Sequence, residues 1–355
     1  MKALRFHAAG DLRVEEVPEP PAPGPTGIVV APRWCGICGT DLHEYVAGPI
    51  VTPAEPHPLT GARLPQILGH EFSGEVVAVG EEVTRVREGD RVAVMPLIFC
   101  GRCEYCRRGL QHLCTTMACT GLSHTWGGLA ELATVEEYQV FAIPDEVTDE
   151  QGALIEPCAV AAYGVGRANV RPGDTVLIAG AGPIGALAAF CAASAGAGTI
   201  YVTEPNAERR ARAERLGLGE TLDPTATDVA AELRERTGGL GVDVAIECAG
   251  FGPAFNTCVQ AVRRQGTVVQ VGLHVRTCEV DPMLWALNDL TILGSWCYGV
   301  NDFPRVAALI ASGRLPVERI VTGNLAVEDA ESGFRRLTAS SPEDMKILIT
   351  TREAV

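Results

Sequence analysis

The sequence predicts an α/β protein with two domains, a β-rich domain followed by a domain built on a doubly wound parallel sheet. Its 355 residues correspond to about two domains of roughly 100–200 residues each. Short alternating apolar runs separated by turn residues fill the first part of the chain and are typical of strands. Beyond about residue 155, apolar runs alternate with alanine-rich helical runs, which indicates a parallel sheet covered by helices.

In the β-rich part, strands are predicted at 27–31, 72–79 and 90–95, next to turn signals such as Glu88-Gly89-Asp90. Five prolines between Pro18 and Pro25 favour an extended connector over a proline-recognition motif.

The second part predicts strands at 175–179, 199–203, 242–248 and 267–271, with helices at 184–195 and 207–216. A helix at 303–312 and a short mixed tail follow, and this tail is too small to form a domain of its own. We therefore expect residues 1–155, completed by 294–355, to form the first domain and residues 156–293 to form the second.

Composition and charge narrow the class of protein. Hydrophobic residues make up 47% and charged residues 21% of the chain, which argues against disorder. The formal net charge of -15 argues against nucleic acid as a partner, because an acidic surface repels phosphates. The N-terminal segment lacks the apolar core of a secretory signal, and the 13 cysteines are an odd number, so a cytoplasmic location is expected.

The uncharged stretch from Thr175 to Thr203 contains a dinucleotide-binding pattern. A membrane helix is the alternative there, but the glycines and Pro183 argue against it, and no membrane partner is expected. Strand 175–179 runs into Gly180-Ala-Gly-Pro-Ile-Gly185 and then a helix, so backbone N–H groups can approach a pyrophosphate.

Glu204 closes the next strand, where a carboxylate can bind ribose hydroxyls and repel a 2′-phosphate. This favours NAD over NADP, although Arg209 nearby could serve a phosphate. A glycine-rich turn without a ligand is the alternative. The candidate cofactor-binding residues are Gly180, Gly182, Pro183, Ile184, Gly185, Glu204 and Arg209, with Cys248, Val271 and Leu273 from later in the same domain.

Four cysteines with C-x2-C-x2-C-x7-C spacing, Cys100, Cys103, Cys106 and Cys114, predict a metal site. Four thiolates can surround one tetrahedral ion and leave no open position, so structural zinc is favoured over an iron–sulfur cluster or no metal. The arginines in this segment could suggest a nucleic-acid zinc ribbon, but solvated side chains fit the acidic chain better.

A second set of potential ligands contains Cys35, Cys38, Asp41 and His43, followed by His70, Glu71 and Glu156. Thiol, imidazole and carboxylate groups spread along a chain are how a fold assembles a catalytic metal site with an open position. Each of these residues taken alone has an ordinary structural interpretation. Only their combination supports the prediction of a catalytic metal site.

Together, the segments 69–80 (GHEFSGEVVAVG) and 89–92 (GDRV), the four-cysteine lobe and the AGAGPIG loop resemble the zinc-dependent medium-chain alcohol dehydrogenases. The match covers essentially the whole chain, and it is most similar to the branch of 2,3-butanediol and sorbitol dehydrogenases. The resemblance implies a GroES-like catalytic domain, a Rossmann NAD-binding domain, one catalytic and one structural zinc ion, and a homodimer or homotetramer.

Residue by residue, the resemblance implies that Cys38 and His70 bind the catalytic zinc, with Glu71 and Glu156 as the carboxylates that complete the site. Thr40 matches the hydroxyl that contacts the substrate oxygen, His43 the outer end of a proton relay, and Asp41 a carboxylate that steadies a ligand. One glutamate at a time is expected on the metal, because adding the second makes the site negative. Cys158 is not expected to bind.

The implied reaction transfers hydride between a secondary alcohol or vicinal diol and NAD. The departures from the family pattern concern the substrate. Glu44 stands where many sorbitol-type enzymes carry Tyr, and Ser123-His-Thr-Trp126 and Met95-Pro-Leu are also unusual. Sorbitol, threonine and cyclic alcohols are alternative substrates, and a non-catalytic NAD-binding protein or a nucleic-acid binder are alternative classes.

Overall fold

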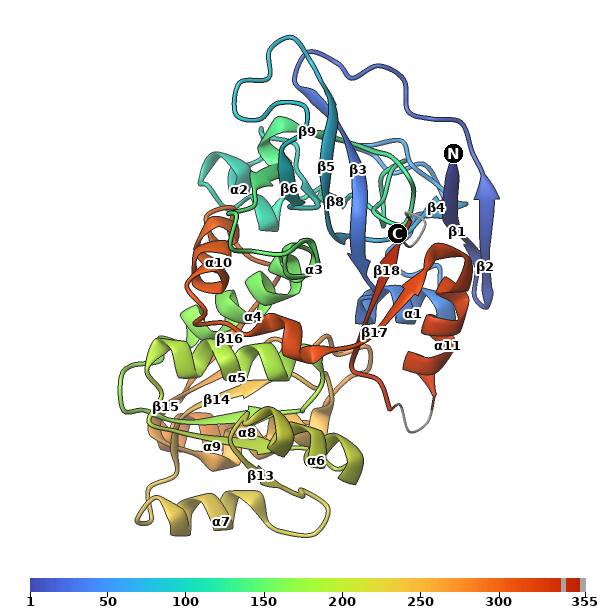
Figure 1. The fold of residues 1–355 in the computed structure, drawn as a ribbon. Coiled ribbons are helices and arrows are strands. Elements are labelled where there is room, and N and C mark those ends of the chain that lie inside the picture. The colour runs from blue at the N-terminus through green and yellow to red at the C-terminus, as the bar shows by residue number, and fades with distance from the viewer. Residues whose placement is uncertain (340–342, 352–355) are drawn as a thin grey trace. The chain divides into compact units, whose positions relative to one another are not determined.

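The computed structural model describes residues 1–339 and 343–351, and the chain divides into two compact units (Figure 1). Unit 1 contains Met1–Glu156, Gly299–Gly313 and the chain from Val321 onward. Unit 2 contains Pro157–Tyr298 and Arg314–Ile320.

Two short segments therefore belong to unit 2 although the sequence suggested the first domain for them. Ser295 N donates to Gln270 O at 2.8 Å, which continues the sheet of unit 2 beyond its last strand. Arg319 packs its guanidinium 5.8 Å from the Phe190 ring centroid and donates to Arg215 O at 3.4 Å. These contacts hold 294–298 and 314–320 against unit 2.

Unit 1 is built on a seven-stranded sheet with the order β10-β6-β5-β3-β18-β17, in which β9 also pairs with β3. A three-stranded sheet, β2-β1-β4, and a two-stranded one, β7-β8, accompany it. The strands are β1 (Lys2–Ala8), β2 (Asp11–Glu16), β3 (Gly27–Gly36), β4 (Gln66–Ile67), β5 (Glu71–Val79), β6 (Arg91–Val94), β7 (Leu97–Ile98), β8 (Ala118–Cys119), β9 (Ala133–Glu136), β10 (Val140–Ala142), β17 (Val321–Ala326) and β18 (Lys346–Thr350). The helices are α1 (Gly39–Ala47), α2 (Glu104–Arg107), α3 (Asp149–Ala153), α10 (Asp302–Ala311) and α11 (Ala330–Thr338).

The three strands predicted in the first part correspond to β3, β5 and β6. Their buried side chains, among them Val30, Phe72 and Val94, form one core with residues of β18 such as Ile347. Because β18 pairs with β3, residues from the end of the chain complete this sheet and its core.

Unit 2 contains a six-stranded sheet in which every neighbouring pair is parallel, with the order β13-β12-β11-β14-β15-β16. Counted along the unit, this order is 3-2-1-4-5-6, the doubly wound dinucleotide-binding topology. The strands are β11 (Thr175–Ala179), β12 (Thr199–Thr203), β13 (Glu220–Leu222), β14 (Val242–Glu247), β15 (Val262–Gln270) and β16 (Thr291–Gly294). The helices are α4 (Ile155–Ala168), which begins in unit 1, α5 (Pro183–Ala195), α6 (Ala207–Leu216), α7 (Val229–Arg236), α8 (Gly252–Ala261) and α9 (Pro282–Asn288).

The predicted strands 175–179 and 199–203 and the helix 207–216 are confirmed residue for residue. The start of β15 was predicted too late, because the strand already begins at Val262. The polar run Arg263-Arg264-Gln265 hides this part of the strand, its register shifts there, and Gln265 has φ +58°.

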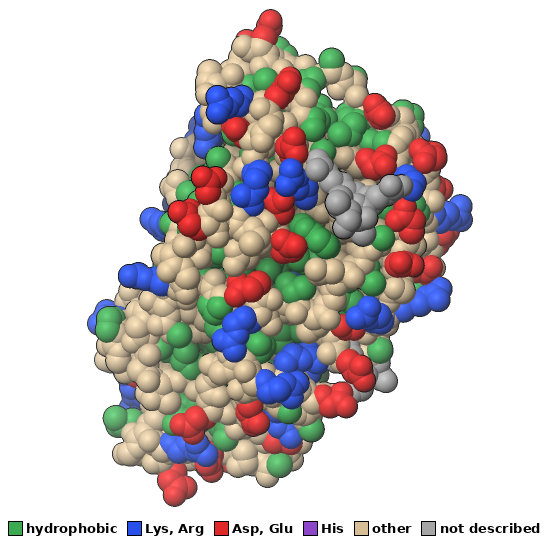
Figure 2. Space-filling model, viewed as in Figure 1, with side chains coloured by type: hydrophobic (Ala, Val, Ile, Leu, Met, Phe, Trp, Pro, Cys, Tyr) green, Lys and Arg blue, Asp and Glu red, His purple; other side chains and the backbone are tan. Residues whose placement is uncertain are grey.

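No helix of residues 1–339 and 343–351 is long and apolar enough to cross a membrane. On the face drawn in Figure 2, acidic and basic side chains are interspersed among uncharged ones, so the net negative charge is not gathered in one area there.

Candidate metal centres and cofactor site

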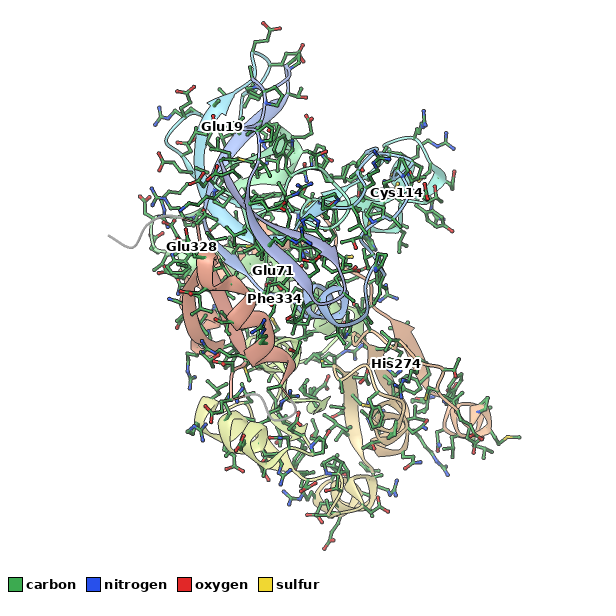
Figure 3. The ribbon with its side chains drawn as sticks, turned by 90° about the vertical axis from the view of Figure 1, so that its right-hand side faces the viewer. Glu19, Glu71, Cys114, His274, Glu328 and Phe334 are labelled. Carbon is green, nitrogen blue, oxygen red and sulfur yellow. The ribbon has the colours of Figure 1, made fainter. Side chains whose placement is uncertain are left out.

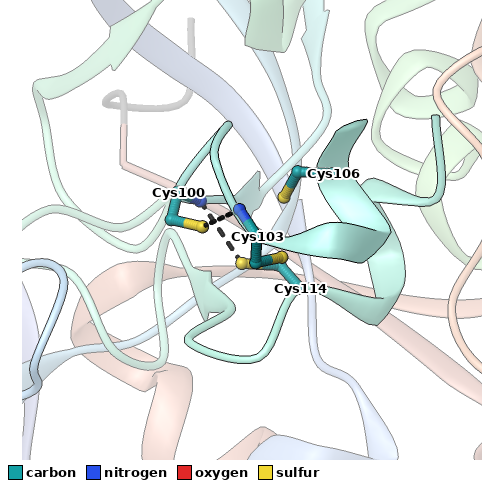
Figure 4. Close-up of side chains that lie close together, drawn as sticks. All are labelled: Cys100, Cys103, Cys106 and Cys114. Atoms are coloured by element: carbon teal, nitrogen blue, oxygen red, sulfur yellow. Dashed lines mark hydrogen bonds between the residues drawn. The ribbon is translucent and has the colours of Figure 1, made fainter. Parts of the chain in front are cut away.

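Four thiols of unit 1 converge in the segment between β7 and β8 (Figure 4). The sulfur atoms of Cys100, Cys103, Cys106 and Cys114 all lie within 4.8 Å of one another. The short helix α2 begins directly after Cys103 and carries Cys106, so the sequence spacing and one helical turn bring the thiols together.

Backbone N–H groups point at these sulfur atoms. Cys103 N donates to Cys100 Sγ and Cys100 N donates to Cys114 Sγ, each at 3.3 Å (dashed in Figure 4). Backbone donors lower the pKa of Cys103 to about 6, whereas burial raises the pKa of Cys106 to about 12. A four-thiolate set supported by backbone N–H groups fits Zn²⁺ in a closed, structural site.

A second cluster in unit 1 combines three ligand types. Donor atoms of Cys38, His70 and Glu71 lie within 4.8 Å of one another. Cys38 precedes α1, and Glu71 opens β5 opposite Gly36 of β3, so one strand pair places the three residues together. Figure 3 shows Glu71 among the strands of unit 1, apart from Cys114 in its lobe.

Asp41 accepts a hydrogen bond from one neighbour in this cluster and lies close to the other without a hydrogen bond. Its Oδ2 accepts from Cys38 N at 2.9 Å, and its Oδ1 lies 3.5 Å from His70 Nδ1. Burial alone would lower the pKa of His70, but the negative charges of Asp41 and Cys38 outweigh it and hold that pKa well above its ordinary value. The negative charges that stabilise a protonated His70 would also attract a cation, so this buried site is suited to bind one.

Lys346 is a buried lysine that the sequence analysis missed. Its Nζ donates to Ile37 O at 2.9 Å and forms an ion pair with Glu71 Oε2. Burial lowers the pKa of Lys346, but the negative charges of Glu71, Cys38 and Glu156 and the hydrogen bond to Glu71 together outweigh burial and raise that pKa above its usual value. Gly36 leaves room for this pair, because a Cβ there would lie 2.9 Å from Lys346 Cε.

Glu156, the second predicted carboxylate, lies in the first turn of α4 and is 8% exposed. It is outside the group whose donor atoms are within 4.8 Å, but its charge acts on Lys346 and Cys119, which places it in the same region of unit 1. Cys158, two residues further on, is fully buried with its sulfur 3.9 Å from Cys191 Sγ. Contact with Cys191, and burial, raise the pKa of Cys158 well above its usual value.

The helix α1 carries the predicted proton-handling residues. Thr40 N donates to Cys38 Sγ at 3.5 Å, so Thr40 lies beside the metal cluster, and His43 is exposed one turn further along the helix. Glu44, by contrast, is fully buried. Its carboxylate accepts from the backbone N–H groups of Ile50, Val51 and Thr52 at 2.5–3.3 Å and from Thr52 Oγ1 at 2.6 Å. Glu44 therefore fixes the chain after α1.

The glycine loop of unit 2 has the geometry that a pyrophosphate site requires. Gly180 has φ +106°, and a side chain at Gly185 would collide with Gly180 O. Gly182 differs, because a Cβ there would meet no protein atom within 4 Å. Gly182 caps α5, with Pro183 and Ile184 opening the helix, so its open side faces the free N–H groups of the helix start. A phosphate fits this cradle.

Glu204 lies at the end of β12 and is buried beside this loop. Its Oε2 accepts from Ala181 N and its Oε1 from Asn206 N, each at 3.1 Å. Arg209 is partly exposed on α6. The next arginine, Arg210, donates to Glu204 O at 2.8 Å and pairs with Asp223 at 2.8 Å, so it holds the strand end.

The remaining predicted cofactor residues follow β14 and β15. Cys248 N donates to Ala179 O at 2.9 Å, Val271 is buried, and Leu273 is 45% exposed. Between these segments lies Glu247, which the sequence analysis also missed. A carboxylate at the carboxyl end of a predicted parallel strand is the signal that could have identified it.

Comparison with known proteins agrees with this architecture. The family model "Alcohol dehydrogenase GroES-like domain" matches residues 24–145, and the model "Zinc-binding dehydrogenase" matches residues 183–312. The (R,R)-butanediol dehydrogenase of Bacillus subtilis is 41% identical over 98% of this chain and 99% of its own length. The sorbitol dehydrogenase of the same organism is 33% identical over 98% of this chain and 97% of its own length.

Solved structures show the same relation. The crystal structure of 2R,3R-butanediol dehydrogenase from B. subtilis has a TM-score of 0.92 and 39% identity, and covers 99% of both chains. A zinc-binding dehydrogenase from Sinorhizobium meliloti, bound to NADP, has a TM-score of 0.87 and 33% identity over 98% of both chains. The chain thus belongs to the zinc-binding, medium-chain alcohol dehydrogenase family, with a GroES-like domain and a Rossmann-type NAD(P)-binding domain, and is an oxidoreductase of small-molecule alcohols.

Proposed function

We propose that this dehydrogenase uses NAD to oxidise vicinal diols of the 2,3-butanediol type, and reduces the corresponding hydroxyketones. Its 41% identity over 98% of the chain to a butanediol dehydrogenase is the observation that carries the substrate class. Oxidation of sorbitol is the second candidate, because a sorbitol dehydrogenase is 33% identical. Glu44 argues against that candidate, since its buried carboxylate holds the backbone at 50–52 where many sorbitol-type enzymes carry Tyr.

A substrate panel read by NADH absorbance tests this proposal. It contains the stereoisomers of 2,3-butanediol, sorbitol, threonine and cyclic alcohols. We expect one butanediol stereoisomer to give the highest kcat/KM. A higher value for sorbitol would make this chain a polyol dehydrogenase, and the absence of turnover with every alcohol would favour a non-catalytic NAD-binding protein.

Two zinc ions per chain are proposed, one held by Cys100, Cys103, Cys106 and Cys114, and one by Cys38, His70 and a glutamate. When bound, the second ion supplies Lewis acidity that lowers the pKa of an alcohol, and NAD supplies the hydride acceptor. Thr40 would accept the hydroxyl proton while giving up its own, and His43, exposed one turn away on α1, would release a proton to solvent at the outer end of the relay. Asp41 keeps His70 oriented throughout.

NAD is the proposed cofactor because of Glu204. With Glu204→Ala, we expect the preference for NAD over NADP, as a ratio of kcat/KM values, to fall about 10- to 100-fold. The reason is that hydrogen bonds to a charged group are worth roughly 1.5–3 kcal/mol, and the charge that repels a 2′-phosphate is lost. Glu208→Ala, on the exposed first turn of α6, is the matched control. Wild-type protein that uses NADP as well as NAD would contradict the assignment and point to Arg209.

A homodimer or homotetramer is also proposed, formed through the edge of the unit 2 sheet. Within the described chain β16 pairs with β15 alone, so its other side offers backbone groups to a second copy. The adjacent helix α9 exposes Met283 (62%) and Leu287 (67%). We expect Leu287→Glu to shift the mass measured by light scattering toward the monomer. Leu240→Glu, at an equally exposed apolar residue (68%) away from this edge, should leave the mass unchanged. A monomeric wild type would refute the proposal.

A cytoplasmic location is proposed from the cysteines. All 13 are free thiols, and eight of them belong neither to the four-cysteine lobe nor to the Cys38 cluster. Such thiols persist in a reducing compartment.

A further inference from the structure

Glu247 is a buried carboxylate at the carboxyl end of β14, with no exposed side-chain surface. Its Oε1 accepts from Ala249 N and Gly250 N, both at 2.8 Å. Its Oε2 lies 3.1 Å from His274 Nε2, which can donate to it. This one side chain therefore holds the loop after β14 and a histidine from the loop after β15.

The backbone of Glu247 joins the same two loops. Glu247 O accepts from Val271 N at 2.8 Å and from Gly272 N at 2.9 Å. A side chain at Gly272 would lie 2.7 Å from Glu247 Oε2 and would collide with Gly250 N. Gly250 and Gly272 of the two loops approach each other closely beside the carboxylate, so its loss leaves a gap and two unpaired backbone N–H groups.

His274 is itself held in place. Its side chain is 14% exposed, and its ring packs edge-on against Phe255 of α8, with the centroids 6.3 Å apart. Figure 3 marks His274 within unit 2. The pair of Glu247 and His274 thus anchors both loops to the sheet and to a helix beside it.

Glu247 and His274 lie at the end of the unit 2 sheet where a dinucleotide binds in this topology. In a doubly wound sheet the dinucleotide binds at the carboxyl ends of the strands, where the strand order reverses. That reversal lies between β11 and β14 here, and the loops that Glu247 holds contain the predicted cofactor residues Cys248, Val271 and Leu273. We propose that Glu247 and His274 are positioning residues that keep these two loops in the conformation that binds the nicotinamide dinucleotide.

Preorganisation is the physical reason for the expected effect. Without the pair, the loops sample other conformations, and ordering them upon binding reduces affinity. Glu247→Gln should therefore raise the Kd for NADH about 10-fold, because an amide cannot accept from all three donors at once. His274→Gln, which leaves the carboxylate in place, should raise it by less. The KM for NAD should rise while the KM for the alcohol and the zinc content stay unchanged.

Asp243 provides a matched control on the same strand. It lies at the amino end of β14, accepts from Thr175 N at 2.8 Å and pairs with Arg263 at 2.6 Å. Asp243→Asn should lower the Tm, but it should not change the affinity for NADH. Asp243 lies at the amino ends of the parallel strands, opposite the carboxyl ends where the two loops lie.

The experiment titrates full-length, zinc-loaded protein with NADH and follows NADH fluorescence, with Tm measured for every variant. This inference rests on NAD as the proposed cofactor, so wild-type protein that fails to bind NADH would refute the proposed function instead. If wild-type protein binds and both Glu247→Gln and His274→Gln bind equally well, the positioning role is wrong. It is also wrong if Asp243→Asn weakens binding as much as Glu247→Gln. Should Glu247→Gln fail to fold, His274→Gln decides the question.

Discussion

Cys103→Ser is expected to remove one of two zinc ions per chain and to lower the Tm by roughly 10 °C. Structural zinc contributes directly to folding, because the site does not exist in the unfolded chain. We expect a loss of about 3 kcal/mol; at about 2–4 °C per kcal/mol, the range for domains of roughly 150–250 residues, this lowers the Tm by roughly 6–12 °C. Zinc content by mass spectrometry and a thermal melt check this result.

The catalytic turnover of the folded fraction should survive this change better than stability does. The four-cysteine lobe lies apart from Glu71 within unit 1 (Figure 3), so the Cys38 cluster need not rearrange. Cys278→Ser makes the same chemical change outside both clusters and should alter neither zinc nor Tm. Unchanged zinc in Cys103→Ser would mean that these thiols do not bind a metal.

The parts of the molecule that the sequence predicts well are those determined by short segments. The glycine loop, its strand and its helix span residues 175–195, and strand periodicity, glycine and a helix start all lie in that one stretch. The four lobe cysteines lie within 15 residues of each other, so their spacing alone indicates a tetrahedral site.

What the sequence does not reveal are partners brought together by folding. Lys346 forms an ion pair with Glu71, which is 275 residues away in the sequence. Lys346 is the first residue of β18, an apolar strand whose sequence indicates only an ordinary core segment. The donors to Glu44 are the Thr52 hydroxyl and three backbone N–H groups, and the direction of these N–H groups depends on how the chain leaves α1. Glu247 at the end of β14 and His274 in the loop after β15 are 27 positions apart, and their contact requires the register of β14 against β15.

Glu156→Ala is expected to reduce the catalytic zinc content or kcat by about two orders of magnitude or more. Cys38, His70 and Glu71 are close enough to share an ion, but Glu71 is already bound to Lys346 and would have to give up that pair. A Cys38 thiolate and Glu156 neutralise Zn²⁺, and the Glu71–Lys346 pair adds no net charge, which preserves the Lewis acidity that the reaction requires. Metal analysis and steady-state kinetics measure the effect.

Two comparison variants test whether Glu156 is the third ligand of the catalytic zinc. Cys158→Ser should leave zinc and kcat close to the wild-type values, because the Cys158 sulfur packs against Cys191 in the core and its raised pKa disfavours the thiolate that a metal needs. Glu71→Gln should keep the zinc but lower turnover, because residue 71 needs a carboxylate to take the place of Glu156 as a zinc ligand. Loss of the ion in Glu71→Gln, with full occupancy in Glu156→Ala, would instead make Glu71 the resident ligand. Loss of the ion in Cys158→Ser would mean that the third ligand is the Cys158 thiolate, with its sulfur about 2.3 Å from zinc, and neither of the two glutamates.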